Sequence, residues 1–217
     1  MNAKLFLLPL TALTLLFFSL IPTCRATVVT FDNLPETGSG SFIPDGYQGL
    51  NWSNFAALNA FLIGANYYPY QPSLSNGYYN GMVTASNVAF NAFGDSTETD
   101  ARGTNFNFLT AYLTGAWSSN VNIEVEGFRG ASLVYSQIVV ASATTPTLFT
   151  FNYLDIDRLT FNSFGGQDAG FPPSGGFGGS IFVMDNLTFE FVPEPSSLLL
   201  ATAGALLLCP LLKRRRA

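Results

Sequence analysis

The chain has 217 residues, of which 48% are apolar and only 11% charged, and its formal net charge is −5. An ordinary soluble domain carries about 25% charged residues. The sequence contains no histidine, which excludes Ser-His-Asp and Cys-His catalysis, histidine-ligated zinc and imidazole acid–base chemistry near neutral pH. Its nine Lys and Arg residues do not provide the electrostatic footprint of a nucleic-acid-binding protein, so we expect no nucleic-acid partner.

Residues 1–26 are predicted to be a secretory signal peptide. Lys4 gives a positive start, an apolar run follows, and Cys24 and Ala26 are small residues at the −3 and −1 positions of a cleavage site. Signal peptidase would then be the first partner of the chain. An uncleaved membrane anchor is one alternative. A lipoprotein acylated at Cys24 is another, although Pro22-Thr23 is a poor lead-in to that cysteine.

Residues 27–192 are predicted to form one all-β domain, an antiparallel β-sandwich or jelly roll. Short β-branched, aromatic or alternating stretches recur along this segment, separated by Gly, Pro, Asn and Ser. The predicted strands are 27–31, 50–55, 105–109, 121–126, 133–140, 147–151, 158–161 and 181–191. One short helix is possible over 55–64, where Gly64 would end it, but the pattern lacks the regular crossover helices of an α/β fold.

This predicted domain differs in composition from the whole chain. Both cysteines, Cys24 and Cys209, lie outside it, so it can form no internal disulfide, thiolate metal site or cysteine nucleophile. Its basic residues are Arg102, Arg129 and Arg158, set against 13 acidic residues, so its net charge is −10. The domain contains no lysine.

Two aspartates are candidate calcium ligands. Asp32 leaves the first predicted strand and Asp185 lies in the last, and each is followed by Asn and Leu. First and last strands often pair in a sandwich, so the two carboxylates could converge, and carboxylate and amide oxygens are what calcium needs. The alternative is that each aspartate caps a turn by accepting backbone N–H bonds. The acidic segment 95–100 lacks the glycine and the closing glutamate of a calcium loop, and a solvated loop is predicted there.

Aromatic residues near turns are the candidate ligand-binding residues. Five tyrosines lie within thirteen residues, namely Tyr67, Tyr68, Tyr70, Tyr78 and Tyr79. Exposed rings of this kind could stack on the faces of sugars, although such tyrosines more often cover an edge of the sandwich. Trp52 could bind a ligand in the same way, but Trp52 and Trp117 both lie in alternating segments, which favours positions in the core.

No catalytic set is predicted. A pair of carboxylates could serve a glycosidase without histidine, but Glu124 and Glu126 would share the polar face of one strand and are predicted to be surface acids. The Phe- and Gly-rich stretch 165–179 is predicted to be a flexible loop. It is not predicted to bind phosphate, because it has no following Lys-Ser/Thr and no strand-to-helix context. We therefore expect a protein without enzymatic activity.

The C-terminal 25 residues carry three features in a fixed order. An apolar run over 198–212 could form a helix about 22 Å long, shorter than the roughly 30 Å hydrocarbon core of a bilayer. The basic tail after it favours insertion with the C-terminus inside the cell. The residues before and after this run are Pro193, Glu194 and Pro195, then Lys213, Arg214, Arg215 and Arg216.

This ending resembles the PEP-CTERM sorting signal of Gram-negative bacteria, in which a Pro-Glu-Pro triplet, a short apolar helix and an Arg-rich terminus follow one another. The resemblance implies that residues 193–217 are recognised by an exosortase, a membrane-embedded cysteine protease. The enzyme would cut near the triplet and release or transfer the body from the inner membrane to the cell surface. A plain tail anchor with a Pro-rich stem is the alternative.

Three segments of the body carry a wider resemblance. Phe31-Asp32-Asn33-Leu34, Tyr47–Trp52 and Met184–Phe189 are similar to segments of exported jelly-roll domains of PEP-CTERM proteins, whose architecture is similar to carbohydrate-binding sandwiches. This resemblance supports the fold. The two processing signals, the compact β body and the lack of a catalytic set lead us to expect a non-enzymatic cell-surface or extracellular-matrix protein associated with exopolysaccharide. The alternative is a carbohydrate-binding module supported by structural calcium.

Overall fold

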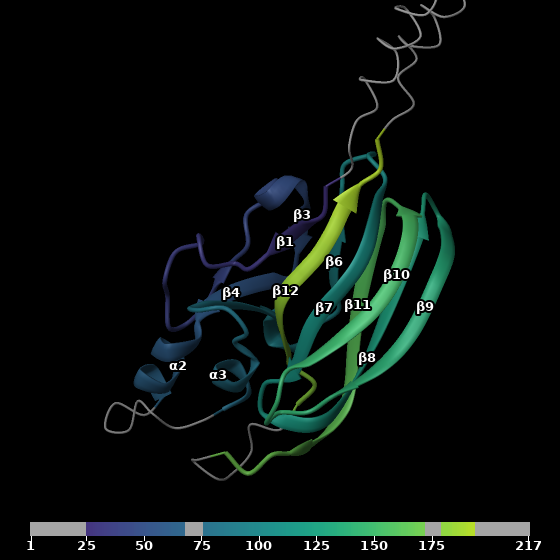
Figure 1. The fold of residues 1–217 in the computed structure, drawn as a ribbon. Helices are drawn as coiled ribbons and strands as arrows, with labels where there is room; N and C mark the ends of the chain where they lie inside the picture. Colours follow the sequence, from purple (N-terminus) through teal and green to yellow (C-terminus); the bar gives the residue numbers. More distant parts are fainter. Residues whose placement is uncertain (1–24, 68–75, 172–178, 194–217) are drawn as a thin grey trace, which may run out of the picture. The chain divides into compact units, whose positions relative to one another are not determined.

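The computed structural model describes residues 25–67, 76–171 and 179–193. Residues Ala26–Val192 form one compact unit, and its described part consists of antiparallel strands with a few short helices (Figure 1). The predicted β-sandwich class is confirmed. The predicted signal helix and C-terminal transmembrane helix lie outside the described residues. Within the three described ranges, no helix combines the length and the hydropathy needed to cross a bilayer.

The first sheet contains seven strands. Its hydrogen-bonded order is β10-β7-β12-β5-β4-β2, and β1 pairs with β12 beside this path. The first and last strands therefore pair, with Thr27 opposite Phe189. The strands are β1 (Thr27–Val29), β2 (Ser41–Phe42), β4 (Phe55–Asn59), β5 (Asn87–Asn91), β7 (Phe106–Gly115), β10 (Thr147–Ile156) and β12 (Phe182–Phe191).

The second sheet contains five strands in the order β3-β6-β11-β8-β9. Strand β8 shows the alternation expected from its sequence, since Val121, Ile123 and Val125 are buried while the residues between them are partly exposed. The strands are β3 (Asn51–Ser53), β6 (Thr97–Asp100), β8 (Ser118–Arg129), β9 (Ser132–Ala141) and β11 (Arg158–Asp168).

A phenylalanine-rich core lies between the two sheets. Many of its rings meet edge to face; the ring centroids of Phe55 and Phe161, for example, are 5.6 Å apart. Such pairs add about 0.5–1.5 kcal/mol each beyond the burial of area. Because residues 27–192 contain no cysteine, no disulfide adds to the stability that this core provides. Its fully buried phenylalanines are Phe31, Phe55, Phe106, Phe108, Phe161, Phe182 and Phe189.

A second, smaller core lies on the outer face of the first sheet. Leu58 and Val183 belong to it, whereas their chain neighbours Ala57 and Met184 belong to the main core, as the alternation of side chains across a strand requires. Helices α2 (Ala60–Tyr67) and α3 (Gly77–Gly81) cover this face (Figure 1). Strand β4 is therefore buried on both faces.

Three predictions about local structure are wrong. The segment 55–64 is not one helix, because its first five residues form β4 and α2 begins at Ala60 and continues through Gly64. The segment 95–100 is not a solvated loop throughout, because Thr97 and Thr99 turn inward as part of β6. Within the stretch 165–179, the first four residues continue β11, paired with β8, and residues 172–178 are not described.

Candidate ligand-binding site

Asp185 is fully buried in β12 and holds the loop that leads into β5. Its Oδ2 accepts hydrogen bonds from the backbone N–H groups of Val83 and Thr84 at 2.7 and 2.9 Å. Its Oδ1 accepts one from Asn186 at 2.7 Å. Burial raises the pKa of Asp185 to about 6 although these three bonds lower it, and the negative charge of Asp32 raises it further.

Asp32 holds the other end of the same loop. Its Oδ1 accepts a hydrogen bond from the backbone N–H of Asn87 at 2.9 Å. The side-chain amide of Asn87 donates to the carbonyl oxygens of Phe31 and Leu34 at 3.2 and 3.0 Å. Both aspartates therefore accept backbone N–H bonds, as the capping alternative predicted. No group of three or more His, Cys, Asp or Glu side chains in the described part of the chain is arranged to hold a metal, and calcium at the two aspartates stays a prediction.

Trp52 lies in the main core, 5% exposed. Its indole N–H donates to the carbonyl oxygen of Tyr47 at 3.0 Å. The rings of Phe31 and Phe55 meet it edge to face, with centroids 5.7 and 5.4 Å away. The core interpretation of Trp52 is therefore confirmed, and a buried ring cannot stack on a sugar from solvent. Trp117 is also buried, in the second core.

The tyrosine-rich segment is only partly described. Tyr67 is the last residue of α2, but its side chain, and Tyr68 and Tyr70 altogether, lie outside what the structure describes. Their role as ligand-binding residues stays a prediction. Tyr78 is buried and Tyr79 is half exposed, so the five tyrosines do not share one environment.

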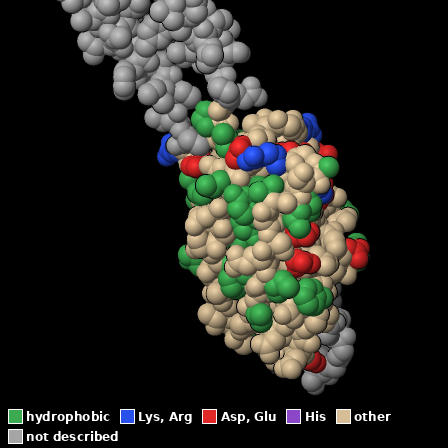
Figure 2. Space-filling model, turned by 90° about the vertical axis from the view of Figure 1, so that its right-hand side faces the viewer, with side chains coloured by type: hydrophobic (Ala, Val, Ile, Leu, Met, Phe, Trp, Pro, Cys, Tyr) green, Lys and Arg blue, Asp and Glu red, His purple; other side chains and the backbone are tan. Residues whose placement is uncertain are grey.

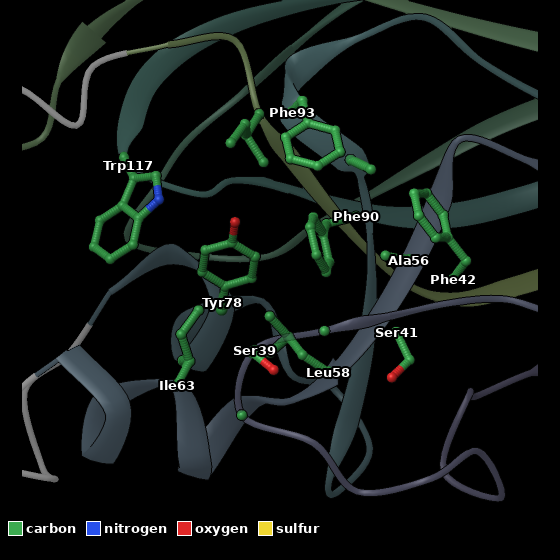
Figure 3. A pocket seen from close by; sticks show the side chains of 14 residues that line it. Ser39, Ser41, Phe42, Ala56, Leu58, Ile63, Tyr78, Phe90, Phe93 and Trp117 are labelled. Atoms are coloured by element: carbon green, nitrogen blue, oxygen red, sulfur yellow. The ribbon is translucent and has the colours of Figure 1, made fainter.

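A pocket of about 420 Å³ opens on the outer face of the first sheet, next to the second core (Figure 3). The loop 38–42, strands β4 and β5, the turn after β5 and both α-helices contribute to its lining, together with Trp117 and Ile181. The chain connection between α2 and α3, where the other predicted tyrosines lie, thus joins two elements that line the pocket.

Tyr78 forms the base of the pocket. Its ring meets Phe90 and Trp117 edge to face, with centroid distances of 5.4 and 5.8 Å. Figure 3 shows the Tyr78 hydroxyl pointing into the space that Trp117, Phe90 and Phe93 surround. The pocket therefore has aromatic walls and a polar atom near its centre.

The N-terminus of α3 places Tyr78 there. Gly77 lies so close to the first sheet that a Cβ atom on it would be 1.8 Å from the carbonyl oxygen of Gly115. Only glycine fits such an approach. Asn76 caps the helix, and its Oδ1 accepts a hydrogen bond from the backbone N–H of Tyr79 at 3.0 Å.

Two phenylalanines at the rim are far more exposed than apolar rings usually are. Phe93 is 85% exposed and Phe42 is 64% exposed. Phe93 also has a left-handed backbone, with φ of 59°, in the 3-10 turn Ala92–Gly94. Such a conformation costs a bulky residue on the order of 1–3 kcal/mol, and strained residues of this kind cluster at functional sites.

The loop 38–42 supplies the polar part of the rim. Gly40 has φ of +85°, and a Cβ atom on it would lie 2.8 Å from the ring of Phe90, so glycine lets the loop pass close to the aromatic wall. The side chains of Ser39 and Ser41 line the pocket on this side (Figure 3). Their hydroxyls can both donate and accept hydrogen bonds.

The described residues that line the pocket include no Asp, Glu, Lys or Arg. A charged ligand would lose water there without gaining a partner, so the lining favours a neutral ligand. The same described residues include no carboxylate that could serve as a general acid or base. Glu124 and Glu126 lie on the outer face of β8 as predicted, and Glu126 accepts a hydrogen bond from the Thr160 hydroxyl at 3.1 Å.

Sequence analysis did not single out Phe42, Phe93 or the serines of the loop 38–42. A weak signal for the two phenylalanines was present, because each lies beside turn residues rather than within an alternating strand. Of the sorting-signal residues, Pro193 is described and exposed. The remaining ones, Glu194, Pro195, Arg214, Arg215 and Arg216, lie outside the described residues.

No protein-family model matches the chain, and no curated protein matches it. Among solved structures, the chain is similar to a DUF4465 family protein from Bacteroides ovatus ATCC 8483, with 8% identity, a TM-score of 0.44, and coverage of 78% of this chain and 100% of that chain. It is also similar to TmCBM61 in complex with β-1,4-galactotriose, with 11% identity, a TM-score of 0.34, and coverage of 76% and 99%. A third is the family 32 CBM from C. perfringens NanJ in complex with galactose, with 11% identity, a TM-score of 0.35, and coverage of 70% and 99%. Similarities of this size carry no conclusion about the fold or the ligand of this chain.

Proposed function

We propose that the domain is a non-catalytic binding module of an exported protein, and that its pocket takes a neutral sugar segment of an exopolysaccharide. The observation that carries this proposal is Phe93, an exposed ring on a strained backbone at the rim of an uncharged aromatic pocket. Sugar rings pack their C–H faces on aromatic planes. Their hydroxyl groups can bond to Ser39, Ser41 and the backbone of the same loop.

Size and charge both agree with such a ligand. Small-molecule sites commonly have volumes of about 300–1,000 Å³, and this pocket has about 420 Å³. The net charge of −10 over residues 27–192 repels anionic polymers at a distance. A neutral polysaccharide is not repelled by this net charge, and it brings no charge that would lack a partner in the pocket.

In this proposal, the two ends of the chain direct the protein to the cell surface. Signal peptidase removes residues 1–26, the C-terminal segment holds the body transiently in the inner membrane, and an exosortase processes the signal 193–217. The described end of the domain supports this order. The backbone N–H of Val192 donates to the carbonyl oxygen of Asn105 at 2.8 Å, and the exposed Pro193 follows. A cut near the Pro-Glu-Pro triplet would leave the sheet intact.

Binding is tested with a glycan array of neutral oligosaccharides, followed by calorimetry with the strongest binder. We expect Phe93→Ala to weaken binding at least tenfold, which corresponds to about 1.4 kcal/mol. Phe164→Ala is the matched control, because Phe164 is an exposed phenylalanine on the outer face of β11. A flat array, or equal losses in both variants, would refute binding in the pocket.

Sorting is tested separately by removing residues 193–217. We expect the truncated chain to move from the membrane and surface fractions to the medium or the periplasm. An unchanged distribution would show that these residues do not direct sorting, and it would leave the binding experiment unaffected.

A further inference from the structure

Each sheet has one short and one long edge strand. The short edges, β2 and β3, have two and three residues, and the long edges, β10 and β9, have ten each. The two long edges lie on the same side of the sandwich (Figure 1), where the rings of Tyr135 and Tyr153 stack with centroids 4.7 Å apart. Within the described ranges β9 pairs only with β8 and β10 only with β7. Each therefore presents backbone N–H and C=O groups on its outer side.

Strand β10 is protected against further pairing. Its register with β7 shifts twice, between Thr150 and Tyr153 and between Tyr153 and Ile156. Asn152 and Asp155 have positive φ at these irregularities, and Asp155 carries a charge. Bulges and charges are the usual devices by which natural edge strands avoid intermolecular pairing.

Strand β9 has none of these devices over most of its length. Its pairing with β8 is regular from Tyr135 to Ala141, and this segment contains no charged residue, proline or glycine. Ile138 and Val140 are 55% and 52% exposed on its outer face. A regular, uncharged, β-branched edge is a template for another strand.

We infer that β9 pairs with β9 of a second copy of this chain, antiparallel, so that two five-stranded sheets join into one. Charge selects both the partner and the direction. The acidic domain repels its own copies over most of its surface, whereas β9 is neutral. Figure 2 shows this side with apolar side chains along its length, acidic side chains partway down it, and Arg side chains toward the upper end.

Apart from Glu124 and Glu126 of β8, which pair with Ile138 and Ser136 of β9, the charged groups near β9 lie at one of its ends. Arg129 pairs with Asp155 beside the start of β9, and Asp157 accepts a hydrogen bond from the backbone of Gly130 there. The other end continues into the uncharged residues 142–146. Antiparallel pairing places the charged end of each copy against the uncharged end of the other, whereas parallel pairing would bring like ends together.

The acids of the neighbouring strand do not oppose this arrangement. Glu124 and Glu126 of β8 would be separated from those of the second copy by three strand spacings, about 14 Å. This exceeds the screening length of about 8 Å at physiological ionic strength. A basic or acidic partner protein would find no complementary charge on β9, so a second copy is the partner that this edge fits.

Sedimentation analysis of the full chain in a mild detergent tests the inference. We expect the protein mass to rise with concentration from that of one chain to that of two, and Ile138→Lys to remain a single chain. Leu154→Lys on β10 is the matched control, because Leu154 is equally exposed, and this variant should still associate. A thermal melt checks that both variants are folded.

Disulfide trapping gives an independent readout. Ile138 is the midpoint of the regular segment Tyr135–Ala141, so a two-fold axis there brings the two Ile138 positions within reach of each other. In a chain with Cys24 and Cys209 replaced by Ser, we expect Ile138→Cys to crosslink as a dimer and Leu154→Cys to remain uncrosslinked. A single chain at all concentrations, or association and crosslinking that do not depend on Ile138, would overturn the inference.

Discussion

On the side of β2 and β3, the sandwich ends in short strands, and helices, tight turns and a pocket occupy the space beyond them. On the side of β9 and β10, it ends in two ten-residue strands joined by one turn. Backbone irregularity on the first side presents rings such as Phe93 to solvent. On the second side, β10 is bulged, but β9 is regular from Tyr135 to Ala141 and presents uniform backbone groups. In the two proposals made above, the irregular edge selects a ligand and the regular strand β9 associates with a second copy.

The largest expected effect is a difference in stability between two Gly→Ala variants, one at a tightly packed position on the first side and one in an open turn on the second. Gly77→Ala should lower the free energy of unfolding by about 3 to 4 kcal/mol, because the new Cβ would lie 1.8 Å from a backbone oxygen. Gly130→Ala, at the turn between β8 and β9, has open space and a φ of +57°, so it should cost only about 1 kcal/mol. Chemical denaturation of both variants measures the difference, and equal losses would contradict the tight approach of α3.

Asp185 should make the stability of the domain depend on pH. Its pKa is about 6 when folded and 3.8 when unfolded, so the folded state binds the proton more tightly. The free energy of unfolding should therefore fall as the pH rises from about 4 to about 6, by up to roughly 3 kcal/mol. Denaturation at several pH values measures this loss.

Asp185→Asn is the variant that isolates this contribution, since the amide does not titrate. We expect the free energy of unfolding to fall less between about pH 4 and pH 6 in this variant than in the unchanged protein. The difference between the two proteins is the contribution of Asp185. If both proteins show the same dependence, the buried carboxyl is not its source.

Backbone strain should differ between the two sides. Phe93→Gly should raise the free energy of unfolding by about 1 kcal/mol while weakening ligand binding, because glycine tolerates the left-handed conformation that Phe93 adopts. Asn152→Gly on β10 relieves a similar φ of 51°, but asparagine tolerates this region, so a gain of only a few tenths of a kcal/mol is expected. Thermal melts compare the two variants, and a destabilised Phe93→Gly would argue against strain at the rim.

The smallest expected effect concerns calcium. We expect millimolar calcium and a chelator to give the same melting temperature, because both oxygens of Asp185 already accept backbone N–H bonds. An increase of several degrees with calcium would instead support the metal site at Asp32 and Asp185. The long-edge side would not respond in either case.

Much of the fold could be predicted where a strand has one face buried and the other exposed to solvent, because its residues then alternate between apolar and polar. The segment 121–126 alternates strictly and forms part of β8 as predicted. Strand β4 could not be found in this way, because the helices cover its outer face and bury both sets of side chains. Strand β6 was missed because its sequence, Thr-Glu-Thr-Asp, turns two small polar residues inward.

The candidate site was less predictable than the fold. The core position of Trp52 followed from alternation. The exposure of Phe93 depends instead on a positive φ, which the sequence signals only through the glycine that follows it. The close approach of Gly77 to Gly115 brings together residues nearly forty positions apart in the sequence. A local sequence pattern cannot predict a contact of this kind.

If the domain is exported as proposed, the scarcity of basic residues bears on its resistance to proteases. Trypsin-like proteases cut only after Lys or Arg, and between Thr27 and Val192 they find three arginines and no lysine. Arg129 ends β8, and its Nε–H donates to the Asp155 carbonyl oxygen at 2.6 Å. Arg158 begins β11 and lies 2.9 Å from a carboxylate oxygen of Glu98. Because cleavage needs an extended, freed backbone, a strand must detach locally before the bond after Arg129 or Arg158 can be cut. Arg102, in contrast, lies exposed in a turn after β6.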